Sequence, residues 1–265
     1  MPGLGVITCQ ILELELAHLL LKDEDIQQVW VKDDEFSKDL IQILEQGDRK
    51  PVRRINQILE FEPDFDLDVL VRVMQVGLHS NIPRLREAVE KAVREIAPAV
   101  DAIFLGYGLC GNALKNLDDL FYDISVPVIL PLDDEGPVDD CVGLIIGGKK
   151  NYYQQQCLCA GTMFMNAGFS RHWQDVMTMD IPEKLLPKKE RILKKIMGSY
   201  QRSLLLPTPV MGEDELRKNA REFNDMYQLR VDSLPGTLEL FEQAWQEAKS
   251  AARKTALRTE SIGPG

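Results

Sequence analysis

The amino-acid sequence predicts an α/β protein with a mainly parallel, Rossmann-like sheet and helices on both faces of that sheet. The first observation is composition: 265 residues, 45% hydrophobic and 28% charged, are enough for a globular protein with an apolar core. The second is that short, β-branched apolar runs alternate with helical stretches along the chain. This alternation favours right-handed crossovers and therefore parallel pairing of the strands.

Eight short runs rich in apolar and β-branched residues predict the strands. In chain order they cover residues 4–9, 29–31, 69–76, 102–105, 126–130, 162–165, 204–206 and 229–231. We expect the strands at 4–9 and 102–105 to be central in the sheet, because both are apolar throughout apart from their ends.

Helices are predicted where apolar residues recur at helical spacing. Residues 84–96 carry one such stripe, and Pro83 suits the first turn of that helix, with Ser80 or Asn81 as its cap. Residues 216–227 and 238–257 carry two more stripes. We expect residues 1–265 to form a single α/β domain, with a lobe boundary, if there is one, in the loop-like segment near residues 131–138.

Charge and cysteine content exclude several classes of partner and compartment. The formal net charge is -11, so the protein should repel nucleic-acid backbones, and the basic pair Arg53-Arg54 is interpreted as part of a solvated helix face. No apolar run approaches the roughly 18 residues of a membrane span, and the first residues do not resemble a signal peptide. Five cysteines, an odd number, argue against a secreted disulfide framework, which predicts a cytoplasmic protein.

Four reactive side chains follow four different predicted strands. Cys9 ends the first strand, His79 follows the third, Cys110 follows the fourth and Cys141 follows the fifth. Because the carboxyl ends of parallel strands share one edge, we expect these side chains to converge there. Such a set suits a transition metal, either zinc or an iron or iron–sulfur centre. The alternative is that the cysteines are small hydrophobic residues of the core.

The loop after the fourth predicted strand contains Gly106-x-Gly108-x-x-Gly111, the spacing of a dinucleotide fingerprint, which is a weak signal alone. We interpret Gly108 and Gly111 as allowing unusual backbone geometry and close approach to a ligand, with Tyr107 and Asn112 around the same pocket.

Asp139 or Asp140 should cap a helix that begins at Cys141. The helix dipole would then lower the pKa of the Cys141 thiol and the adjacent carboxylates would raise it, so the net direction is open. Asp140 is also a candidate acceptor for the imidazole N–H of a metal-bound His79.

Other reactive residues receive no role from the sequence. Cys157 and Cys159 should point to one side of an extended segment, while His18 and His172 have the pattern of ordinary helix or surface histidines. Gly147-Gly148 is interpreted as a turn.

Several of these motifs, in this order and spacing, resemble domain-of-unknown-function family 1638 over residues 7 to about 173. The matching residues are Cys9, Glu13, Gly77-Leu78-His79, Tyr107-Gly108-Leu109-Cys110-Gly111-Asn112, Asp140-Cys141, Gly147-Gly148, Tyr152 or Tyr153, and Gly161-Thr162. The resemblance adds Glu13 to the expected ligand-binding residues. Many bacterial members carry histidine where this chain has Asp140, and the Asp-Asp-Cys form resembles the branch from methanogenic archaea.

The family has no assigned activity, but its members tend to lie near corrinoid-dependent methyltransferase systems. The resemblance therefore implies a metal-binding enzyme or accessory factor in corrinoid-dependent methyl transfer or one-carbon metabolism, with a corrinoid protein or small molecule as partner. The alternative is a non-catalytic protein that binds a small molecule or a corrinoid partner and has structural core cysteines.

Overall fold

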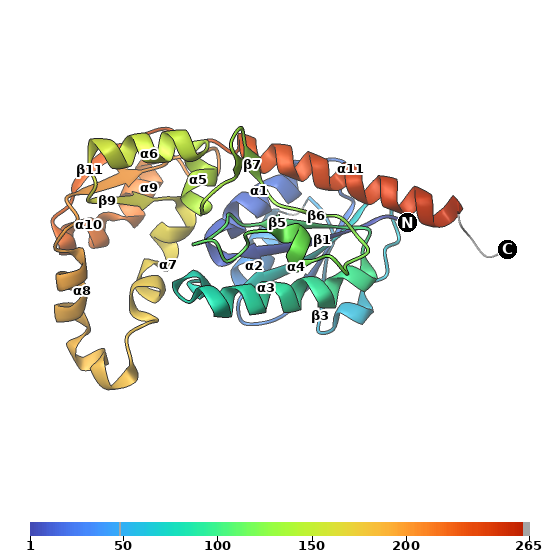
Figure 1. The fold of residues 1–265 in the computed structure, drawn as a ribbon, viewed down its shortest axis with the longest axis horizontal. Coiled ribbons are helices and arrows are strands. Elements are labelled where there is room, and N and C mark those ends of the chain that lie inside the picture. The colour runs from blue at the N-terminus through green and yellow to red at the C-terminus, as the bar shows by residue number, and fades with distance from the viewer. Residues whose placement is uncertain (48, 262–265) are drawn as a thin grey trace.

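Two parallel sheets organise the chain in the computed structural model, which describes residues 1–47 and 49–261 (Figure 1). Within those residues the larger sheet has the strand order β3-β2-β4-β1-β5-β6, the smaller has the order β11-β10-β9, and β7 and β8 form an antiparallel hairpin. The strands are β1 (Gly3–Cys9), β2 (Gln28–Lys32), β3 (Val52–Ile55), β4 (Asp68–Met74), β5 (Ala102–Gly106), β6 (Val128–Ile129), β7 (Leu132–Asp133), β8 (Gly136–Pro137), β9 (Thr162–Met165), β10 (Arg202–Leu205) and β11 (Arg230–Ser233).

Helices connect the strands of both sheets. They are α1 (Glu13–Lys22), α2 (Lys38–Gly47), α3 (Ile82–Ile96), α4 (Leu117–Leu120), α5 (Cys141–Ile146), α6 (Lys149–Leu158), α7 (Ala167–Thr178), α8 (Lys189–Met197), α9 (Glu213–Asn219), α10 (Arg221–Tyr227) and α11 (Glu239–Ser261). Short 3-10 turns lie at η1 (Gln10–Leu12), η2 (Ile58–Glu60), η3 (Leu78–Ser80), η4 (Ala97–Ala99) and η5 (Glu183–Lys188).

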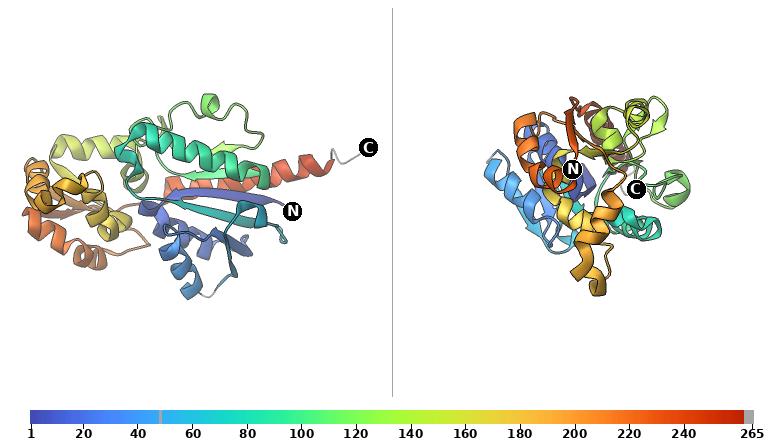
Figure 2. Two further views of the ribbon diagram at one scale, coloured as in Figure 1. Left: turned by 90° about the horizontal axis from the view of Figure 1, so that it is seen from below. Right: turned by 90° about the vertical axis from the view of Figure 1, so that its left-hand side faces the viewer.

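The larger sheet has an apolar core on each face, which confirms the predicted α/β class with helices on both sides. On one face α1, α2 and α11 cover the sheet, and Phe104 of β5 meets the rings of Phe241 and Trp245 edge-on at 5.2 and 5.6 Å. On the other face α3 covers the sheet (Figure 2). Its apolar stripe, including Val89, belongs to one buried cluster with Ile103 of β5. The strand β1 lies between β4 and β5, and β5 lies between β1 and β6.

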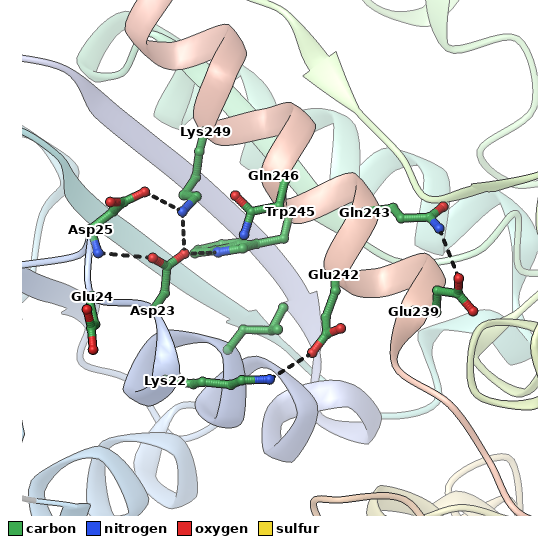
Figure 3. A pocket seen from close by; sticks show the side chains of 11 residues that line it. Lys22, Asp23, Glu24, Asp25, Glu239, Glu242, Gln243, Trp245, Gln246 and Lys249 are labelled. Carbon is green, nitrogen blue, oxygen red and sulfur yellow. Dashed lines mark hydrogen bonds and ion pairs between the residues drawn. The ribbon is translucent and has the colours of Figure 1, made fainter.

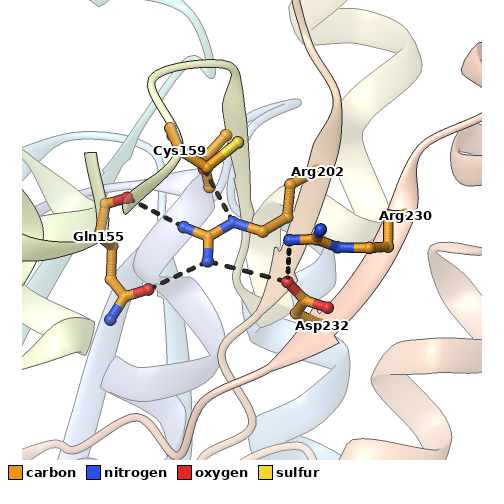
Figure 4. Close-up of polar contacts among 6 residues, drawn as sticks. Gln155, Cys159, Arg202, Arg230 and Asp232 are labelled. Atoms are coloured by element: carbon orange, nitrogen blue, oxygen red, sulfur yellow. Dashed lines mark hydrogen bonds and ion pairs between the residues drawn. The ribbon is translucent and has the colours of Figure 1, made fainter. Parts of the chain in front are cut away.

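The smaller sheet forms a third apolar core with α7, α8, α9 and α10. On its other side α6 is attached by the buried guanidinium of Arg202 (Figure 4). Nε of Arg202 donates to Oγ1 of Thr162 at 2.9 Å, a terminal nitrogen donates to the carbonyl of Gln155 at 3.0 Å, and another pairs with Asp232 at 3.8 Å. One arginine thus joins β9, β10, β11 and α6.

Several local predictions differ from the structure. The run at 126–130 forms only the two-residue strand β6, and the stripe at 216–227 is divided at Ala220 into α9 and α10. Arg53 and Arg54 lie on the edge strand β3, which the sequence did not predict, and not on a helix. Cys157 lies in α6 and not in an extended segment. Residues 131–138 contain the hairpin β7–β8, between the two sheets.

The helix α3 begins as predicted, because the side chain of Asn81 accepts a hydrogen bond from the backbone N–H of Arg84 at 3.0 Å. Within residues 1–47 and 49–261, no helix is both long enough and apolar enough to span a membrane.

A buried lysine fastens α11 to the segment after α1 (Figure 3). Nζ of Lys249, whose side chain is 3% exposed, lies 2.6 Å from a carboxylate oxygen of Asp23 and 2.7 Å from one of Asp25. The indole N–H of Trp245 also donates to Asp23 at 2.6 Å. Burial would raise the pKa of Asp23, but the hydrogen bonds from Lys249 and Trp245 outweigh it and hold that pKa below its usual value of 3.8.

Replacing Lys249 with Met should therefore destabilise the protein by on the order of 3 kcal/mol at pH 7, since it leaves the largely buried carboxylate of Asp23 without its ion-pair partner. Urea unfolding measures the loss.

The lowered pKa of Asp23 contributes stability above pH 3.8 that disappears as the pH falls through the pKa that Asp23 has in the folded protein. The difference in unfolding free energy between the wild type and the Lys249 variant should therefore become smaller at low pH. The matched control is Lys22→Met, which removes an exposed ion pair with Glu242 and should cost less than about 1 kcal/mol. Equal losses in the two variants would contradict this role for Lys249.

Candidate functional site

The carboxyl edge of the larger sheet brings the four predicted metal ligands to one pocket. Cys9 is the last residue of β1, His79 lies in η3 after β4, Cys110 lies in the loop after β5, and Cys141 is the first residue of α5. All four line a narrow pocket of about 30 Å³, a space of the size of one water molecule or ion. Tyr107 and Gly108 line it too. The convergence that parallel topology predicts is therefore present.

A strained loop carries Cys110. The backbone φ angles of Cys110, Gly111 and Asn112 are 46°, 69° and 68°, so three consecutive residues are left-handed. The backbone N–H of Cys110 donates to the carbonyl of Asp139 at 2.7 Å, and the N–H of Leu109 donates to the carbonyl of Val138 at 2.8 Å. These bonds join the loop to the segment that leads into α5.

The two segments touch backbone to backbone at Gly108. A Cβ atom at this position would lie 2.6–2.8 Å from the N, Cα and C atoms of Asp140, so only glycine fits. Asp140 in turn caps α5, since Oδ1 accepts a hydrogen bond from the N–H of Gly143 at 2.9 Å. Asp139 instead accepts a hydrogen bond from the hydroxyl of Tyr153 at 2.9 Å. Together these contacts place Cys110 beside Cys141.

Burial keeps the three thiols protonated in the metal-free protein. It raises the pKa of Cys9 to about 11, and the charge of Glu13 adds to that rise. Burial likewise raises the pKa values of Cys110 and Cys141, with Asp140 contributing to both. The net shift of the Cys141 pKa is thus upward, the direction that the sequence left open. Burial also lowers the pKa of His79 more strongly than the charge of Asp140 raises it, so its imidazole is neutral at pH 7.

The spacing of the donor atoms is wider than that of a preformed metal centre. The atoms of Cys9, His79, Cys110 and Cys141 line one pocket, but no three of them lie within 4.8 Å of one another. Opposite ligands of one zinc ion are about 4 Å apart, so an ion would draw these side chains closer by rotation about χ1. Metal coordination by this set stays a prediction.

A larger cavity of about 560 Å³ opens beside the narrow pocket, between the two sheets. His79, Cys110, Gly111, Asp140 and Cys141 line it from the larger sheet. From the other side it is lined by aromatic and polar side chains, among them Tyr152, Gln156, Thr162, Phe164, Asn166 and Phe169. The ring of Tyr152 stacks on that of Phe164, with centroids 5.0 Å apart.

Two polar groups at these cavities lack partners. Asn166 is 1% exposed; its Oδ1 accepts a hydrogen bond from the N–H of Phe169, which caps α7, but its Nδ2 has no partner among the described residues. The buried hydroxyl of Tyr107 is also unpartnered within residues 1–47 and 49–261. Buried polar groups normally form hydrogen bonds, so both are available to a ligand.

The structure does not bring every predicted site residue to these cavities. Asn112 is exposed and lines neither of them. Glu13 is fully buried at the start of α1, where Oε1 lies 3.1 Å from Nε2 of His172. His172 is therefore not an ordinary surface histidine. In the second wall of the cavity, Tyr152 and Thr162 belong to the motifs that resemble the family, and Asn166 has a capping position before an apolar helix. The other residues of this wall carry no sequence signal.

Comparison with known proteins gives one match. A family model described as a protein of unknown function (DUF1638) matches residues 73–245, more than half of the chain. The matched region contains His79, Cys110, Cys141 and the lining of the larger cavity except Ile11, and it begins after Cys9 and Glu13. No curated protein and no solved structure matches significantly.

Replacing Gly108 with Ala should force the Cys110 loop away from Asp140 and destabilise the protein by roughly 1–3 kcal/mol, the usual effect of overpacking. Thermal unfolding measures the change. Gly143→Ala is the matched control, since its Cβ would meet Val138 at an ordinary 3.5 Å and alanine favours the helix. A loss at Gly143 as large as that at Gly108 would argue against the loop contact as the cause.

Proposed function

The chain belongs to the DUF1638 family of proteins of unknown function, and we propose that it is a metal-binding protein that holds one transition-metal ion at Cys9, His79, Cys110 and Cys141. The observation that carries the proposal is that these four side chains, from four separate connections, line one pocket with room for a single ion. If the cysteines were only small residues of the core, nothing would favour three thiols and an imidazole in the same pocket.

The donor chemistry fits a borderline or soft metal. Three sulfurs and one imidazole are ligands that zinc, iron and iron–sulfur centres accept. The neutral imidazole of His79 offers a free lone pair. Cys9 raises the pKa values of Cys110 and Cys141, and Cys110 raises that of Cys141, so thiolate forms of this set would need a cation beside them. When bound, the metal would supply Lewis-acid activation of a thiol or a redox centre.

The larger cavity gives the proposed metal site a place for a small-molecule ligand. His79, Cys110 and Cys141 line both the narrow pocket and this cavity, so a ligand between the sheets would reach the same side chains. The stacked rings of Tyr152 and Phe164 favour a ligand with a flat apolar part, and Nδ2 of Asn166 favours a hydrogen-bond acceptor on it.

We extend the proposal to an enzyme or accessory factor in corrinoid-dependent methyl transfer or one-carbon metabolism, in which the corrinoid is a partner's ligand. This extension comes from the family resemblance alone. Turnover with a methylated corrinoid and a thiol acceptor would support an enzyme; metal binding without turnover would support an accessory factor.

A second candidate function is non-catalytic binding of a small molecule, with the cysteines as parts of the core. The packing favours it: Cys9 and Cys110 contact the hydrophobic cluster beneath α3, while Cys141 contacts the cluster beneath α11. The raised pKa values of all three thiols fit this candidate as well.

Metal analysis of protein purified without oxygen separates the two candidates. The metal-binding proposal predicts about one zinc or iron per chain, and a several-fold lower content after Cys110→Ser with folding retained. The matched control is Cys157→Ser, because Cys157 is exposed on α6 and should not affect the metal. No metal in the wild-type protein, even after incubation with Zn²⁺ or Fe²⁺ under reducing conditions, would leave the core-cysteine candidate.

A further inference from the structure

A second group of metal-type ligands lies outside both cavities described above. Glu13 is the first residue of α1, Asp39 is in the first turn of α2, and His172 is on α7. One ligand atom from each lies within 4.8 Å of the other two, and this is the only such trio in residues 1–47 and 49–261. We propose that these three residues bind one divalent first-row transition-metal cation, and that this site is separate from the thiol pocket.

The distances suit one ion. Oε1 of Glu13 lies 3.1 Å from Nε2 of His172. Adjacent ligands at about 2.1 Å from an octahedral ion are about 3.0 Å apart, and opposite ligands are about 4.2 Å apart. The trio thus needs only small side-chain movements to surround a cation, in contrast to the four residues of the thiol pocket.

A buried, unpartnered oxygen points to the ion independently of the spacing. Glu13 is fully buried, and its Oε2 has no hydrogen-bond partner in the part of the chain that the structure describes. An ion pair of Glu13 with protonated His172 would satisfy only Oε1. A cation would also satisfy Oε2 and would explain the approach of Asp39 from a third element. Leaving a carboxylate oxygen buried without a partner is costly.

The donor set selects the class of metal. Two carboxylates and a neutral imidazole carry two negative charges, which match a divalent cation, and they contain no sulfur. Such ligands suit Mn²⁺ or Fe²⁺ better than the soft thiolate set does. Asp39 is exposed, so water would complete the coordination from that side. The ion would cross-link α1 and α2 of the larger sheet to α7, which lies at the junction of the two sheets (Figure 1).

Titration of the whole chain with Mn²⁺, followed by the loss of the free-ion paramagnetic resonance signal, tests the proposal. We expect one Mn²⁺ per chain, and at least about tenfold weaker binding after Asp39→Asn, since even residues behind the ligands change affinity by 10- to 100-fold. Asp39 is exposed, so this variant should fold. The matched control is Asp175→Asn, which removes an equal charge from an exposed position on α7, where the carboxylate acts on His172 through its charge alone. This variant should weaken binding much less than Asp39→Asn does. Glu13→Gln should weaken binding as well.

Three results would overturn this assignment: no stoichiometric binding of Mn²⁺, an equal loss of affinity after Asp175→Asn, or abolition of the binding by Cys110→Ser. In the last case the ion would belong to the thiol pocket. Unchanged Mn²⁺ binding in Cys110→Ser, together with its loss in Asp39→Asn, would establish a site whose existence does not depend on the proposed function of the cysteines.

Discussion

The contact between Gly168 and Ile11 fixes the smaller sheet on the carboxyl edge of the larger one. A Cβ at Gly168 would lie 1.9 Å from the carbonyl oxygen of Ile11, so no other residue permits this approach of α7 to η1. The cavity shared by the two sheets depends on that approach. So does the position of His172, which α7 carries to Glu13. A single backbone contact therefore determines which side chains from the two sheets can meet.

Much of the larger sheet could be predicted, because its strands are buried and their composition is uniform. The runs at β1, β4 and β5 are apolar throughout or nearly so, and the stripe of α3 has one clear face. The strand β3 was not predicted, because its two arginines face solvent at the edge of the sheet and its residues do not form an apolar run. Its pairing with β2 holds these residues in a strand. The division at Ala220 leaves the apolar spacing unchanged, so no periodicity could reveal it.

The thiol pocket followed from chain order alone, because a parallel sheet places the connections after β1, β4 and β5 at one edge. The opposite wall could not be predicted in this way. Asn166 in that wall, and His172 outside the cavity, belong to elements of the other sheet, and their approach depends on how the two sheets dock. A sequence contains helix and strand periodicities, but the docking of two sheets depends on close backbone contacts such as that at Gly168. In the sequence, Gly168 cannot be distinguished from any other glycine.

Because α11 covers part of the larger sheet, the sheet cannot complete its core until the end of the chain has been synthesised. A ribosome delivers β1 to β6 long before it delivers Glu239, yet Phe104 is covered by Phe241 and Trp245. During that interval the part of one apolar face that α11 will cover is exposed, and about a hundred further residues, including the whole smaller sheet, must emerge first. Nascent chains of this protein are therefore candidates for chaperone binding until Lys249 can reach Asp23 and Asp25.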